Sequence, residues 1–222
     1  MEKFFKLYKD FFNSKEEKNK FHLNSSELRV LIGVELSRSI LTNTSVIHED
    51  TLLTVINKPL TKRNKTMVRE AISSLHNKTI IDIVEERGSV YVITSLFSKT
   101  NEMSFNQLPI DELFYVLKEI KSDDLLYLYL AIRAWEYNGQ SLNFSNQALA
   151  NICRVDRRTI QRRTRQLESE KLIKVERVSK QKNHISTLGS QFCKVDKSKE
   201  TVSVKLMTQE SKNEEAKRAF GI

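Results

Sequence analysis

The chain has 222 residues, of which 37 are lysine or arginine and 28 are acidic, giving a formal net charge of +9. This balance favours a polyanionic partner, because lysine and arginine gain free energy by releasing counterions condensed on phosphate. Five scattered glycines cannot build a phosphate-binding loop, and four scattered histidines form no metal-ligand spacing. We therefore expect a protein that is not an enzyme and needs no cofactor or metal.

The N-terminal segment contains the aromatic and basic stretch Phe4–Phe12. We predict an aromatic and basic helix within residues 1–20, packing on its own domain or on a second subunit. A segment lying on a bilayer is the alternative, but we expect no membrane partner, since no apolar run reaches a membrane-spanning length. The N-terminus lacks the apolar run of a signal peptide, and Cys153 and Cys193 form no CxxC pair. These features predict a cytoplasmic protein with reduced thiols.

Hydrophobic periodicity then divides the chain into two modules with a connector between them. Residues 21–98 form the first module and residues 99–121 a connector with a short helix from Ile110. Residues 122–192 form the second module, and residues 193–222 a charged tail. The first module is expected to contain helices at Ser25–Leu41, His48–Ile56 and Leu60–Leu75, and strands at Thr79–Val84 and Ser89–Thr94, with Gly88 at positive φ in the turn between them.

The second module begins with the most apolar helix of the chain, Ser122–Tyr137, which Ser122 or Asp123 can cap. A short helix follows at Ser145–Cys153, with Ser145 as its cap. Asp156 is expected to cap the next helix, at residues 156–170. An alternating strand, Lys171–Val178, then leads to a basic loop at residues 179–184 and a return strand at Ile185–Leu188.

The helix at residues 156–170 carries the strongest functional signal. Six arginines lie between Arg154 and Arg165, against one acid, Asp156. On a helix, Ile160, Thr164 and Leu167 share one face, which leaves the basic and amide side chains on the others. Arginine can bind guanine bidentately and glutamine can bind adenine in the same way. The predicted DNA contacts are Arg157, Arg158, Thr159, Gln161, Arg162 and Arg165. A solvated basic helix without a partner is the alternative.

This order of elements resembles the bacterial winged helix-turn-helix superfamily. The resemblance rests on Leu149-Ala150, on Val155-Asp-Arg-Arg-Thr-Ile-Gln-Arg162, on Leu167-Glu168 and on Lys171-Leu-Ile173, and it covers residues 122–190. It implies that the hairpin after the basic helix is a wing. Lys180 and Lys182 are then expected to lie on phosphates beside the groove.

A second copy of the pattern lies upstream. Shifting the chain by 92 residues aligns Val68 with Ile160 and Leu75 with Leu167. The expected fold is therefore mainly α with small β-wings (α+β), with two winged helix-turn-helix modules in tandem. The first module can have lost its DNA role and serve dimerisation instead, because a fold alone does not fix a function. Its candidate DNA contacts are Lys62, Arg63, Asn64, Lys65, Thr66 and Arg69.

Three functions fit these patterns, and all but the last require double-stranded DNA. The first is a transcriptional regulator, most simply a repressor that binds as a homodimer. The second is a plasmid or phage replication initiator, since two such modules in one chain resemble the architecture of theta-type plasmid initiators, which bind directly repeated sites. The third is an adaptor whose modules bind protein.

Overall fold

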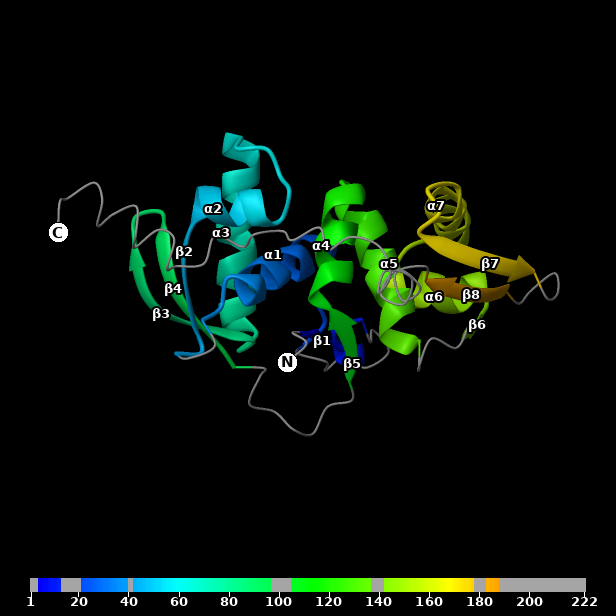
Figure 1. Cartoon of the computed structure of the whole chain (residues 1–222), viewed down its shortest axis with the longest axis horizontal. Coiled ribbons are helices and arrows are strands. Elements are labelled where there is room, and N and C mark those ends of the chain that lie inside the picture. Colours follow the sequence, from blue (N-terminus) through cyan, green and yellow to red (C-terminus); the bar gives the residue numbers. More distant parts are fainter. Residues whose placement is uncertain are drawn as a thin grey trace, which may run out of the picture.

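The computed structural model describes residues 4–12, 21–39, 42–96, 105–136, 142–177 and 183–187. It shows a mixed α/β architecture, which is compatible with the predicted α+β class, with small sheets at both ends of an elongated molecule and a short two-stranded sheet between them (Figure 1). The predicted charged tail at residues 193–222 lies outside the described residues.

The order of elements is the same in both halves: helix, strand, helix, helix, strand, strand. The outer strands flank the last strand in both sheets, with orders β2-β4-β3 and β6-β8-β7, and all pairs are antiparallel. The first half comprises α1 (Ser25–Leu36), β2 (Thr44–His48), α2 (Glu49–Val55), α3 (Lys62–Asn77), β3 (Ile81–Arg87) and β4 (Val90–Ser95). The second comprises α5 (Asp123–Trp135), β6 (Leu142–Phe144), α6 (Asn146–Cys153), α7 (Arg157–Ser169), β7 (Ile173–Arg177) and β8 (Asn183–Thr187).

The N-terminal segment is a strand, so the prediction of a helix there was wrong. Residues Phe4–Tyr8 form β1, followed by a single 3-10 turn at Lys9–Phe11, and β1 pairs with β5 (Phe105–Pro109). Phe5 and Leu7 are buried whereas Phe4 is exposed and Lys6 half-buried, which is the two-residue period of a strand. The segment 99–121 was predicted to be a connector with one short helix. It contains that helix, α4 (Ile110–Glu119), and also the strand β5 immediately before it.

Strand β2 was not predicted either, because its polar Ser45 faces the core and its apolar Val46 faces solvent. Ser45 is buried and its hydroxyl donates to the Val34 carbonyl at 2.7 Å, whereas Val46 points outward with 68% of its surface exposed. A strand with a polar residue inside and an apolar residue outside gives no amphipathic signal.

Side-chain caps fix where the helices of the second half begin. Ser122 accepts from the Leu125 N–H, Ser145 from the Ala148 N–H and Asp156 from the Thr159 N–H, so these three predicted caps are confirmed. In the first half, Asn24 caps α1 in a reciprocal box with Glu27, and the helix ends at Leu36, earlier than predicted.

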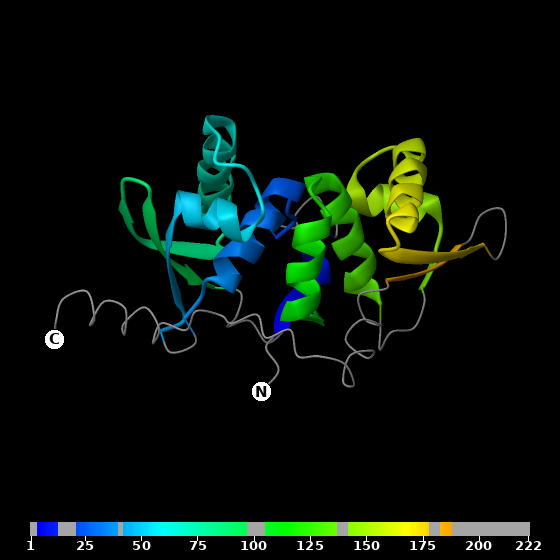
Figure 2. The ribbon, with the colours of Figure 1, turned by 45° about the horizontal axis from the view of Figure 1, so that its top comes forward.

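One apolar core runs through both halves. Helix α5 lies at its centre and is buried from Leu125 to Ala134, between α1 on one side and α6 and α7 on the other. Helices α3 and α7 lie on the same face of the molecule, while the β3–β4 and β7–β8 hairpins extend toward opposite ends (Figures 1 and 2). Among the described helices, none is both long and apolar enough to span a membrane.

Candidate nucleic-acid interface

Helix α7 is held at its start by a cap and a sharp turn. Asp156 accepts from the backbone N–H of Thr159 at 2.8 Å and from its hydroxyl at 2.6 Å, and these hydrogen bonds lower the pKa of the Asp156 carboxyl. Arg154, at the end of α6, has the left-handed φ of 52° that reverses the chain toward α7. Thr159 was predicted to contact DNA, and its hydroxyl is hydrogen-bonded to the cap Asp156 within the protein.

The buried face of α7 is the predicted one. Ile160 and Leu167 have no exposed surface and Thr164 has 5%. Three exposed arginines, Arg158, Arg162 and Arg165, lie on the opposite side, and Gln161 is half-buried. A fourth, Arg157, is exposed because it is in the first turn of the helix, beyond the buried row. No described carboxylate forms an ion pair with any of the four, so their charges are available to a partner. We call these residues the arginine face: Arg157, Arg158, Arg162 and Arg165.

Arg163 differs from its neighbours on the helix. Its side chain is only 16% exposed and its guanidinium forms an ion pair with Asp124 at the start of α5. It lies three residues after Ile160 and four before Leu167, which places it at the edge of the buried row. Arg163 therefore fastens α7 to the core and does not belong to the arginine face.

Helix α3 occupies the equivalent place in the first half, but most of its candidate residues have partners. Lys65 forms an ion pair with Asp50 at 2.7 Å, and Arg69 with Glu49 at 2.6 Å. Asn64 donates to the Pro59 carbonyl and Thr66 to the Lys62 carbonyl. Lys62 and Arg63 are exposed and form no ion pair with any residue of the described ranges. The basic surface of α3 is thus concentrated at its first turn.

The comparisons with known proteins bear on the second half. Residues 121–173 match the family model of a helix-turn-helix domain. The matched segment runs from the turn before α5 to the first residue of β7, and it includes the whole arginine face. Helix-turn-helix domains place their second helix in the major groove of DNA, so the match points to DNA as a partner. No curated protein matches the chain.

The hairpin β7–β8, at the end of the matched segment, is anchored by a buried carboxylate. Thr187 of β8 donates both its backbone N–H and its hydroxyl to the carboxylate of Glu136, which is 1% exposed. Burial raises the pKa of the Glu136 carboxyl. Sequence reasoning missed this contact because an acid just after an apolar helix ordinarily faces solvent. The predicted phosphate contacts Lys180 and Lys182 lie between the two strands, outside the residues that the structure describes.

The hairpin of the first half has the opposite charge. Strand β3 carries Asp82, Glu85 and Glu86, and Arg87 forms an ion pair with Glu85. Gly88 has the positive φ, 62°, that the turn requires, as predicted. An acidic hairpin is repelled by phosphate, so this hairpin is not suited to the phosphate contacts that were predicted for the hairpin of the second half.

Proposed function

We propose that this protein binds double-stranded DNA sequence-specifically, with α7 as the recognition helix of a winged helix-turn-helix module. The observation that carries the proposal is the arginine face: four exposed arginines without carboxylate partners among the described residues, three of them opposite the buried row of a helix inside a segment that matches a helix-turn-helix domain. A helix with side chains is about as wide as the major groove, at roughly 10–12 Å.

The roles of individual side chains follow from their position on α7. Arg158, Arg162 and Arg165 follow one another at helical spacing on the exposed side, where they can reach base edges or the adjoining phosphates. Gln161 lies beside them and can bind adenine. Arg157, in the first turn, is suited to phosphate. In this proposal Lys180 and Lys182 lie on the phosphate backbone and position the domain without reading sequence.

The biological role we propose first is transcriptional regulation, as a repressor that covers a two-fold-related site as a homodimer. One observation favours the second candidate, replication initiation at directly repeated sites. Helix α3 repeats the place of α7 in the same chain, and both lie on one face (Figure 2). If the first half is also a winged helix-turn-helix module, one chain can then contact two successive major grooves, about one helical turn apart, without a partner subunit.

The test is selection of bound duplexes from a random pool, followed by binding of the enriched duplex at increasing salt. Sequence-specific binding by α7 predicts an enriched motif and an affinity that falls linearly on logarithmic axes with salt. Inverted repeats covered by dimers support the regulator, and direct repeats covered by single chains support the initiator. Absence of any enriched sequence would refute sequence-specific binding, and the arginine face would then be a nonspecific surface.

A further inference from the structure

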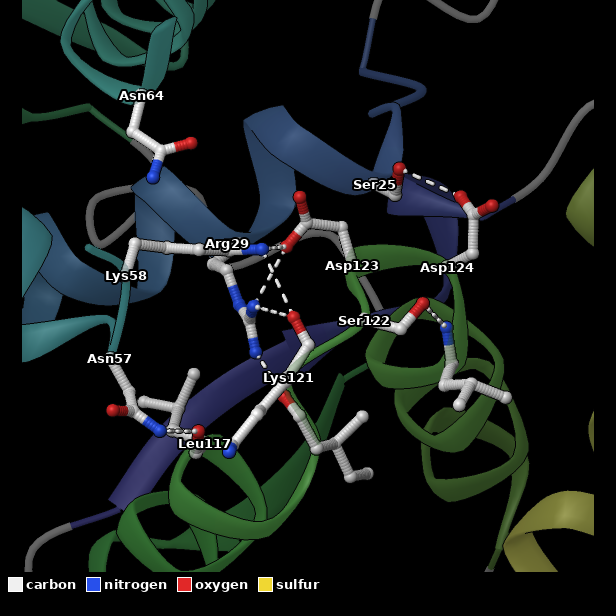
Figure 3. A network of polar contacts seen from close by, with 12 residues as sticks. Ser25, Arg29, Asn57, Lys58, Asn64, Leu117, Lys121, Ser122, Asp123 and Asp124 are labelled. Carbon is white, nitrogen blue, oxygen red and sulfur yellow. Dashed lines mark hydrogen bonds and ion pairs between the residues drawn. The ribbon is translucent and has the colours of Figure 1, made fainter. Parts of the chain in front are cut away.

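The segment where α4 ends and α5 begins contacts both halves of the molecule. We define it as the α4–α5 junction, residues 117–124. It contains the last residues of α4, the cap Ser122 and the first two residues of α5. Figure 3 shows polar side chains from the first half converging on its carbonyls and carboxylates.

Arg29 of α1 is the most deeply buried of these side chains. It has no exposed side-chain surface, and it donates to the Lys121 carbonyl at 2.9 Å, to Asp123 at 2.8 Å and to the Ile120 carbonyl. A buried guanidinium persists only when carboxylate and carbonyl oxygens surround it, and removal of a partner is costly. Arg29 therefore ties α1 firmly to the α4–α5 junction.

The turn between α2 and α3 makes a second attachment. Asn57 donates to the carbonyls of Leu117 and Lys118, both at 3.2 Å, which satisfies free carbonyls at the end of α4. Lys58 donates to the Lys121 carbonyl at 3.0 Å and pairs with Asp123 at 2.9 Å (Figure 3). This turn leads into α3, which Thr61 caps, so these bonds tether the segment that precedes α3 to the α4–α5 junction.

Asp124 makes the attachment to the other recognition helix. One of its carboxylate oxygens accepts from Ser25 of α1 at 3.1 Å, and the other pairs with Arg163 of α7. The α4–α5 junction is thus bonded to the turn that precedes α3 and to the middle of α7. The polar contacts of this short segment therefore join the two helices, in addition to the apolar packing of α1 against α3 and α5 and of α5 against α7.

We propose that the α4–α5 junction fixes the separation and angle of α3 and α7, so that the protein recognises the spacing between two DNA half-sites. Arg29, Lys58, Asp123 and Asp124 are positioning residues in this scheme, since none of them needs to contact DNA. The inference rests on the proposed DNA binding and adds that both halves engage one duplex. Two modules held rigidly gain avidity only at a spacing that suits both, by a factor of about 100 or more.

The experiment first locates by footprinting the two DNA segments that the protein covers, one for each half. It then measures affinity for the enriched duplex and for versions with one to ten base pairs inserted between these two segments. Five inserted base pairs turn one segment about half a helical turn away from the other. For the wild-type protein we expect this insertion to weaken binding about 100-fold. The paired variant Lys58→Met with Asp123→Asn should bind the original duplex more weakly but change by less than about threefold across the series, because loosened halves adjust to each spacing.

Two further variants keep the test independent of folding. Asp124→Asn removes a half-exposed carboxylate and should flatten the spacing response partially while the thermal midpoint stays close to wild type. Glu35→Gln is the matched control. Glu35 lies on α1, as Arg29 does, but its ion pair is with Arg38, just beyond the end of α1 and away from the α4–α5 junction. The control should retain the wild-type spacing response.

The possible results distinguish failure of the spacing proposal from failure of the proposed DNA binding. A flat spacing response in the wild-type protein, or the same steep response in wild type and in the Lys58→Met, Asp123→Asn variant, overturns the inference and leaves sequence-specific binding intact. Failure to bind any duplex overturns both. A steep wild-type response that flattens only in the junction variants supports the proposal.

Discussion

The carboxylate of Glu49, which has no exposed surface, accepts two hydrogen bonds from Arg69, at 2.6 Å from Nε and 3.0 Å from Nη2. The only other hydrogen bond to this carboxylate within the described residues comes from the Tyr91 hydroxyl at 3.3 Å. Arg69 was predicted to contact DNA, yet its guanidinium compensates a buried charge. Arg69 thus holds α3 against the start of α2, while 56% of its side chain remains exposed.

We expect Arg69→Met to lower the thermal midpoint of unfolding, because the variant leaves Glu49 buried without a cation. Arg63→Met removes an exposed charge without a carboxylate partner and should weaken DNA binding while leaving the midpoint unchanged. Thermal unfolding and binding of the enriched duplex, measured on both variants, check this division. Unchanged stability of Arg69→Met together with lost binding would return Arg69 to the DNA contacts.

Arg158→Ala is expected to relax the preference for one base pair and to cost about 1–3 kcal/mol of binding free energy. The reason is that Arg158 lies on the exposed side of α7, where a bidentate contact to guanine can form. Competition among duplexes that carry each base at every position of the site measures the change. Arg163→Met is the internal comparison, since Arg163 pairs with Asp124 and should not alter base preference.

Lys182→Ala should weaken binding to all duplexes by a similar factor. A lysine on phosphate carries no sequence information, and its loss lowers the slope of log affinity against log salt by about one unit. Salt titrations of wild type and variant on specific and random duplexes give both quantities. A base-specific loss would show instead that the loop reads sequence.

The stability of the fold should fall on mild acidification through His22. Burial, together with the charges of Arg154 and Lys78, lowers the pKa of His22 to about 4. The unfolded chain, with a histidine pKa of about 6.5, binds more protons than the folded chain between these values. Stability contributed by neutral His22 is therefore complete above about pH 7 and is lost as the pH falls toward 4.

Urea unfolding at pH 7 and pH 5 tests this contribution on wild type and on His22→Gln. The wild-type protein should lose more unfolding free energy between the two pH values than the variant, because only the wild type has the histidine to protonate. The nearby carboxyl of Glu27 is present in both proteins, so its titration cancels in the comparison. Equal losses would contradict the assignment.

Local chemistry made helix α7 predictable from sequence. Asp156 fixes its start, and the spacing of Ile160, Thr164 and Leu167 fixes its buried side, so the exposed positions of Arg158, Arg162 and Arg165 follow from helical geometry. The partners of the basic residues did not follow. Glu49 and Asp124 are far in sequence from Arg69 and Arg163, and only tertiary packing brings each acid to its arginine.

Strand pairing was the least predictable part of the fold. Strand β1 finds its partner β5 about a hundred residues later, and short strands gain most of their stability from such distant neighbours. The aromatic run in β1 also obscured its alternation, because consecutive phenylalanines can be buried in a helix or a strand.

The pairing of β1 with β5 has a consequence for synthesis on the ribosome. Phe12, just after β1, packs against Tyr127 and Trp135, with ring centroids 5.1 and 6.0 Å apart, so this aromatic segment is covered by residues of α5 that are made more than a hundred residues later. A nascent chain must expose its N-terminal phenylalanines until α5 has emerged. Such distant pairing slows folding and exposes the growing chain to aggregation, which makes its early aromatic segment a natural target for chaperones.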